Sequence, residues 1–157
     1  MGLKISLPKG RKFLGYWLPP LVWCGMMLAL SGDLGSAHNT QKLLQWLLPT
    51  LSPAHFDLIH FYLRKGVGHV GDYGLLYFLW FRAFRADLGY RGGRAFLWSL
   101  GLCLAMALLD EGHQSLLASR SGSLRDVGLD LAGSSGAALI LTIFRTPGAE
   151  AESVTEA

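Results

Sequence analysis

Charged residues and cysteines are both scarce in this chain. Of its 157 residues, 16% are charged and 51% are hydrophobic, a balance more typical of a protein in a bilayer than of one in water. The two cysteines, Cys24 and Cys103, lie in separate apolar runs, which excludes a disulfide framework and the paired spacing of a zinc site. The HExxH pattern of metallohydrolases is also absent. We therefore predict neither a bound metal nor another cofactor, although histidine and carboxylates on two helices could hold a divalent ion.

The sequence also lacks a basic stripe. The formal net charge is +3, but the lysines and arginines are not interleaved with aromatic residues along one segment, as they are in many nucleic-acid-binding proteins. They gather instead at the ends of apolar runs, which is typical of membrane proteins. Nucleic acid is therefore not an expected partner.

Four long apolar runs dominate the sequence, at residues 13–31, 67–81, 95–109 and 127–144. A helix needs about 20 mainly apolar residues to cross roughly 30 Å of hydrocarbon. The last three runs reach this length only when their polar ends are counted within the helices. We therefore predict an all-α fold, an integral membrane bundle of four transmembrane helices over residues 13–144, with spans at about 13–31, 66–84, 94–116 and 126–144.

The first run allows two interpretations. The basic stretch KGRK before it resembles the start of a signal peptide. The run has no clear small-x-small cleavage site, however, and the pair Pro19-Pro20 stands within it. We interpret it as a retained span, in which the two prolines kink or interrupt the helix.

The basic flanks of the spans predict the orientation of the bundle. The basic residues fall into two sets on opposite sides of the membrane. The smaller set consists of Lys42, Arg64, Lys65, Arg120 and Arg125. The larger set consists of Lys4, Lys9, Arg11, Lys12, Arg82, Arg85, Arg91, Arg94 and Arg145. Because basic loops stay in the cytoplasm, we expect both termini there: residues 1–12 as a basic segment and residues 145–157 as a disordered tail.

The first outer connection, residues 32–65, contains two short apolar-rich runs at 41–48 and 56–63. Ser52 is a good helix N-cap, and Pro53 suits the first helical position. Each run is too short to span a bilayer, so we expect two helices lying in the membrane interface. A fifth span at 43–63 is the alternative, but it would bury two prolines, two histidines and Asp57.

Polar residues converge at one depth of this predicted bundle, on the side away from the termini. Residues three or four apart share a helix face, so His69 faces the same way as Asp72 and Tyr73. Ionisable groups at membrane depth normally face a wet cavity or one another, because burying them unpaired is costly. The candidate catalytic residues are Asp110, Glu111 and His113, and the candidate ligand-binding residues are Lys65, His69, Asp72, Tyr73, Gln114, Arg120, Arg125, Asp126 and Asp130. A purely structural network of the same groups, without a ligand, is the alternative.

The segments DEGHQSLLASRSGSLRDVGLDLAG and RKGVGHVGDYGLLYFL resemble the two motifs of the VanZ-like family of small bacterial membrane proteins. The resemblance covers residues 13–144. Two departures stand out: the family's basic residue usually lies three positions before the histidine, so Arg64 or Lys65 could fill that role, and Asp130 stands where many members have Asn. The resemblance implies a cell-envelope role, since the founding member is linked to low-level teicoplanin resistance.

The polar site and the resemblance together lead to an expected function. We expect a multi-pass protein of the bacterial inner membrane that binds, and in one version modifies, the headgroup of an envelope lipid or lipid-linked glycan. Whether it is an enzyme stays open at this point, as does assembly into an oligomer. The alternative is a non-enzymatic membrane protein whose polar cluster locks the helices together.

Overall fold

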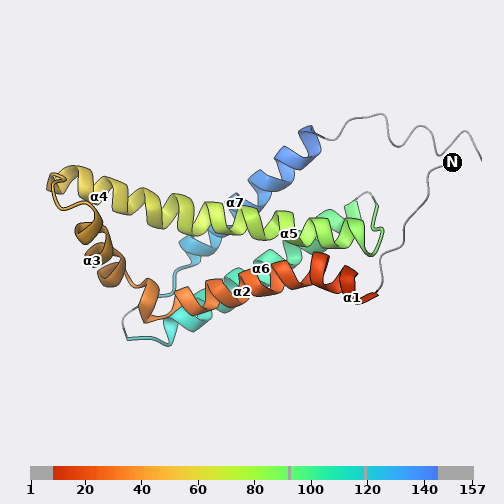
Figure 1. Cartoon of the computed structure of the whole chain (residues 1–157), viewed down its shortest axis with the longest axis horizontal. Coiled ribbons are helices and arrows are strands. Elements are labelled where there is room, and N and C mark those ends of the chain that lie inside the picture. Colours follow the sequence, from red (N-terminus) through yellow and green to blue (C-terminus); the bar gives the residue numbers. More distant parts are fainter. Residues whose placement is uncertain (1–8, 92, 119, 145–157) are drawn as a thin grey trace, which may run out of the picture.

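The computed structural model describes residues 9–91, 93–118 and 120–144, and within these ranges every regular element is a helix (Figure 1). The predicted all-α class is thereby confirmed. Residues 1–8 of the predicted basic segment, and the whole predicted tail 145–157, lie outside the described residues.

Four long helical stretches form the bundle. The first runs from α1 (Lys9–Lys12) through the π-helical η1 (Phe13–Trp17) into α2 (Leu18–Ser31). The second is continuous through α4 (Pro53–Tyr62), the π-helical η3 (Leu63–Gly71) and α5 (Asp72–Ala86). The third and fourth are α6 (Gly93–Ser115) and α7 (Leu124–Ile143). The short 3-10 helix η2 (Asp33–Gly35) and α3 (Ala37–Leu47) connect the first stretch to the second.

Within the described part of the chain, three helical segments are long and apolar enough to cross a membrane: Gly10–Ser31, Gly93–Ser115 and Leu124–Ile143. The predicted span 66–84 falls in η3 and α5, whose polar side chains, among them His69, Asp72 and Arg82, lower its hydropathy. Yet α5 is the central helix, because it packs against α2, α6 and α7. Its buried face includes Tyr73, Leu76, Tyr77, Trp80, Ala83 and Phe84.

The first connection differs from the predicted pair of separate short helices. Helix α3 begins before residue 41, because Ser36 caps it by accepting a hydrogen bond from the backbone N–H of Asn39 at 3.3 Å. Helix α4 begins at Pro53 as predicted, but the helical stretch that it starts does not end near residue 63. Since no proline interrupts residues 54–86 and the glycines there keep helical backbone angles, α4 continues through η3 into α5 (Figure 1).

The proline pair changes the type of helix rather than ending it. Pro19 and Pro20 stand in the first turn of α2, where missing backbone N–H groups are best tolerated. The five residues before α2 form the π-helical η1. The predicted interruption is therefore a switch from π-helical to α-helical geometry at Leu18.

The closest helix contact lies where η3 crosses α7. A Cβ atom added to Gly133 would lie 2.8 Å from the Cα of Val70 and would overlap its carbonyl oxygen. One turn further along, an added Cβ on Gly74 would lie 3.5 Å from the carbonyl oxygen of Gly133 and 3.9 Å from the Cβ of Ala137. The small residues Gly133 and Ala137, one turn apart on α7, thus allow the helices to approach closely.

We predict that Gly133→Ala destabilises the bundle by about 1–3 kcal/mol, because the added methyl must push two backbones apart. The thermal midpoint of the purified protein in detergent measures this loss. Gly136→Ala on the same helix is the control, since a Cβ there meets nothing within 4 Å. Equal midpoints for the two variants would show that the close crossing is not needed.

At the opposite end of the bundle, Asp87 ties the first helical stretch to the end of α5. Its carboxylate accepts a 2.7 Å hydrogen bond from Trp17 Nε1 and pairs with Lys12 Nζ at 3.4 Å. The Trp17 hydrogen bond, and then Lys12, hold the pKa of Asp87 below its ordinary value, although some burial works against them. The next residues turn through Gly89, whose φ of 63° suits glycine.

We predict that Asp87 stabilises the fold above its ordinary pKa and that this contribution disappears as pH falls through the lower folded value. The thermal midpoints of wild type and Asp87→Asn should therefore differ at about pH 7 and converge towards about pH 3. A difference that stays constant over this range would contradict the assignment.

Candidate functional site

A cavity of about 670 Å³ opens at the end of the bundle where α2 and α6 end and η3 and α7 begin. Helices α3 and α4 project beyond this end, away from the N-terminal end of the described chain (Figure 1). The polar lining comprises Ser31, Thr40, His60, Arg64, Lys65, His69, Asp72, Tyr73, Asp110, Gln114, Arg120, Ser121 and Asp126. The apolar lining includes Met27, Leu30, Leu43, Leu44, Leu47 and Leu63. The cavity is therefore amphiphilic.

A chain of ion pairs connects η3 with the start of α7. Lys65 Nζ lies 2.6 Å from Asp126 Oδ1, and Asp126 Oδ2 lies 3.8 Å from His69 Nε2. The other ring nitrogen, His69 Nδ1, lies 2.8 Å from Asp130 Oδ1. Asp130 is completely buried, whereas the Lys65 side chain is 33% exposed. The chain thus runs from a half-exposed ammonium at the rim to a carboxylate inside the bundle.

Helix α6 adds two further buried carboxylates. Asp110 Oδ2 accepts a hydrogen bond from Gln114 Nε2 at 3.0 Å, one helical turn away. Glu111 Oε2 accepts a 2.6 Å hydrogen bond from the backbone N–H of Ser123, the residue before α7. Each carboxylate uses one oxygen in this way. The second oxygens, Asp110 Oδ1 and Glu111 Oε1, are buried without a hydrogen-bond partner among the described residues.

Two arginines bind backbone carbonyls at the cavity wall. Arg120 donates from Nε to the carbonyl oxygen of Ser31 and from Nη2 to that of Leu30, both at 3.1 Å. Arg64 donates from Nη1 to the carbonyl oxygen of Gly35 at 3.1 Å. A guanidinium has five N–H groups, so these bonds leave donors that an anion in the cavity can use.

The structure gathers most of the candidate residues, but not all in the same way. Lys65, His69, Asp72, Tyr73, Asp110, Gln114, Arg120 and Asp126 line the cavity. Glu111 instead borders a smaller pocket of about 230 Å³ next to Gly122 and Ser123, and Asp130 lies buried behind His69. His113 is exposed and interacts with Ser31 at 3.3 Å, and Arg125 is exposed; neither lines the cavity.

Several residues at the cavity could not be recognised from the sequence. Thr40 lies 3.0 Å from His60 Nε2 and accepts from Arg64 at 3.4 Å, which links α3 to the end of α4. These contacts join distant segments, so no local pattern points to them. The leucines of α3 are recognisable as the apolar face of an amphipathic helix, and part of that face closes the cavity.

The sequence model of the VanZ/LLP1 family matches residues 16–145. The chain belongs to the VanZ/LLP1 family. The expected resemblance is thereby confirmed. Neither the curated proteins nor the solved structures contain a significant match to the chain.

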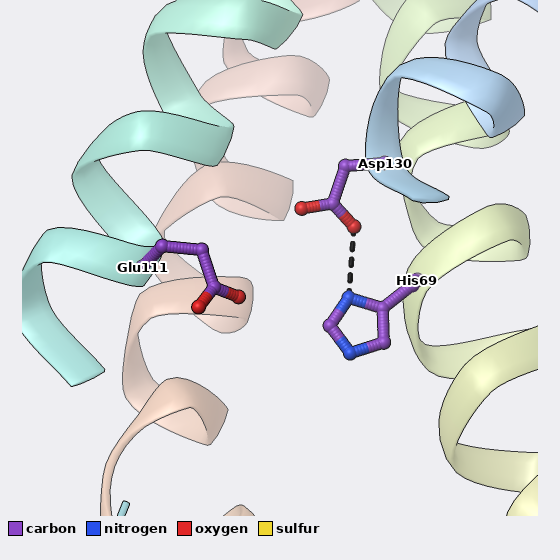
Figure 2. Close-up of side chains that lie close together, drawn as sticks. All are labelled: His69, Glu111 and Asp130. Atoms are coloured by element: carbon purple, nitrogen blue, oxygen red, sulfur yellow. Dashed lines mark hydrogen bonds and ion pairs between the residues drawn. The ribbon is translucent and has the colours of Figure 1, made fainter. Parts of the chain in front are cut away.

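One group of side chains in this VanZ/LLP1 protein is arranged as metal ligands often are. His69, Glu111 and Asp130 each place one donor atom within 4.8 Å of the others. Figure 2 shows the three side chains converging from η3, α6 and α7. An imidazole with two carboxylates can relay a proton, bind a cation or neutralise charge, so the arrangement allows chemistry as well as structure.

We predict that His69→Leu lowers the free energy of unfolding by about 3–5 kcal/mol, because it leaves the buried Asp130 without its partner. The double variant His69→Leu/Asp130→Leu should recover much of this loss, since it removes both charges. Lys65→Met, at a pair that is partly exposed, should cost less than about 1 kcal/mol. Unfolding titrations in detergent, with a chelator present, measure the free energy of unfolding of all three variants. A double variant as unstable as His69→Leu would contradict the pairing of His69 with Asp130.

Proposed function

We propose that this VanZ/LLP1 protein binds the anionic headgroup of an envelope lipid, or of a lipid-anchored glycan, in the cavity between α2, α3, η3, α6 and α7. The observation that carries the proposal is the amphiphilic lining of that cavity. Leu43, Leu44 and Leu47 of α3 supply a wall suited to an acyl or prenyl chain, while charged groups line other parts of the cavity.

The charges of the cavity fit a headgroup that carries both acidic and hydroxyl groups. Arg64 and Arg120 at the wall have spare N–H donors for a phosphate or carboxylate. Asp72, Asp110 and Gln114 can accept or exchange hydrogen bonds with sugar hydroxyls. Modification of the headgroup, with Asp110 as acid or base at the cavity wall, is the catalytic version of the same proposal.

The proposal places the cavity in the outer leaflet half of the bacterial inner membrane. In this placement, residues 66–84 form a fourth span, which the neighbouring helices shield from the lipid. Helix α3 and the start of α4 then lie in the interface between membrane and water. Both termini are then cytoplasmic, as the basic flanks favour. Lowered susceptibility to teicoplanin belongs to the same proposal, because that drug and lipid-linked glycans meet at this membrane face.

A structural lock is the second candidate function, and specific contacts favour it. Arg120 holds the last carbonyls of α2, Glu111 holds the N-terminal end of α7, and His69 holds Asp130. The Arg120 bonds tie the α6–α7 connection to the end of α2, the Glu111 bond ties α6 to the start of α7, and the His69 bond ties η3 to α7. In this candidate the polar cluster pins the helices, and the protein acts on its surroundings without binding a headgroup.

We predict that polyprenyl phosphate or phosphatidylglycerol raises the thermal midpoint of the detergent-purified protein, whereas phosphatidylcholine does not. A ligand at a hundred times its Kd stabilises by about 2.7 kcal/mol. Ala118→Trp should remove this lipid effect by filling the cavity, which Ala118 lines from an exposed position. Ala54→Trp, exposed on α4 and outside the cavity, is the matched control.

The variants Asp110→Asn and Arg120→Ala separate the two candidates. Headgroup binding predicts a stable protein whose lipid-dependent stabilisation is reduced. A structural lock predicts loss of folded yield with or without lipid. If wild type shows the same small midpoint shift with every lipid, headgroup binding is wrong.

A further inference from the structure

Glu111 and Asp130 share an unusual feature: each is a buried carboxylate with one oxygen bonded and one oxygen left over. Asp130 is fully buried and Glu111 is 6% exposed. Asp130 Oδ1 is held by His69, and Glu111 Oε2 by the N–H of Ser123. Asp130 Oδ2 and Glu111 Oε1 have no hydrogen-bond partner among the described residues. An ionised carboxylate oxygen only accepts, so each of these oxygens calls for a donor or a cation.

The charge balance at this place is also unfavourable. Lys65 neutralises Asp126, but no lysine or arginine of the described chain forms an ion pair with Glu111 or Asp130. His69 is the one basic side chain in the group. Two buried carboxylates therefore face a single imidazole, and uncompensated charge in an apolar surrounding is strongly disfavoured.

We propose that His69, Glu111 and Asp130 form a binding site for a divalent transition-metal ion, with Zn²⁺ as the best fit. The three donor atoms lie within 4.8 Å of one another, and Figure 2 shows them turned towards a common space. One imidazole nitrogen and two carboxylate oxygens are a known ligand type for Zn²⁺, which takes three protein ligands where a fourth position stays open. Ca²⁺ and Mg²⁺ fit less well, because they prefer six or more oxygen ligands or several waters.

The surrounding contacts support such a site. Ser123 donates to one oxygen of Glu111, which fixes the carboxylate and leaves its other oxygen for the ion. In the metal-bound form His69 Nδ1 would bind the ion in place of its contact with Asp130 Oδ1, and a proton on Nε2 would face Asp126, which lies 3.8 Å away. The close crossing at Gly133 brings η3 against α7, so the ligands come from segments that pack tightly.

The site stands on these three residues and does not depend on lipid binding. His69 also lines the large cavity, so a bound ion would present positive charge to an anionic headgroup there. That last consequence alone rests on the proposed function.

The test uses the full chain, purified in detergent without a tag, stripped with chelator and kept free of lipid. Equilibrium dialysis against Zn²⁺, Mn²⁺, Mg²⁺ or Ca²⁺, followed by elemental analysis, should find about one Zn²⁺ per chain. Zn²⁺ should also raise the thermal midpoint. Glu111→Gln keeps the oxygen that Ser123 binds and removes the other, so it should fold and bind Zn²⁺ at least about tenfold more weakly. Asp130→Asn should behave likewise.

Two controls address other carboxylates and the surface. Asp110→Asn also alters a buried, half-bonded carboxylate, but one outside the three-residue group, and should keep the ion. The double variant His55→Ala/Asp57→Asn removes two exposed side chains of α4 that are capable of binding metal ions, and it should also keep the Zn²⁺. Wild type that binds no Zn²⁺ or Mn²⁺ overturns the proposal, whatever the variants do. Undiminished Zn²⁺ binding by folded Glu111→Gln and Asp130→Asn also overturns it. Lipid-dependent stabilisation is scored separately, because it tests headgroup binding and not the metal site.

Discussion

The close crossing of η3 over α7 is the contact on which the polar site depends. Gly133 has no side chain, so the backbone at Val70 can lie directly against it. His69 precedes Val70 in the chain, and Asp130 lies one helical turn before Gly133 on the same face. The crossing therefore determines that the imidazole of His69 meets the carboxylate of Asp130. A larger residue at Gly133 would separate them without touching either side chain.

The second constraint is the cost of burying charge. A network that served only to hold helices together would be most stable with every polar atom paired, or with apolar residues in its place. Here Asp110, Glu111 and Asp130 each keep one buried oxygen unpaired by the described protein. Bonds such as that of Ser123 to Glu111 hold these carboxylates in position without completing their coordination. Buried carboxylate oxygens that are held in place but unpaired call for a further partner, such as an ion or a group of a bound molecule.

The sequence predicted the helices and the two polar faces well, because both follow from local rules. Run length predicted the apolar helices, and spacing by three placed His69 on the same helix face as Asp72. Local rules could not predict that α4, η3 and α5 form one continuous stretch, because glycine permits a helix as well as a break. They also could not separate His113, which is exposed and does not line the cavity, from Gln114, which does. Adjacent residues differ in direction by the helical rotation, and only the packing of α6 decides which faces inward.

Glu111 and Asp110 have different surroundings although they are neighbours, because the helical rotation turns them in different directions. Asp110 faces the large cavity with Gln114, whereas Glu111 is rotated towards the start of α7 and the smaller pocket. Under the two proposals, Asp110 would meet a headgroup in the large cavity, and Glu111 would meet an ion held between the helices. His69 connects the two places, because its ring lines the cavity while its Nδ1 lies against Asp130. A change at Asp130 therefore alters the hydrogen bond of His69 Nδ1, and through that ring the lining of the cavity.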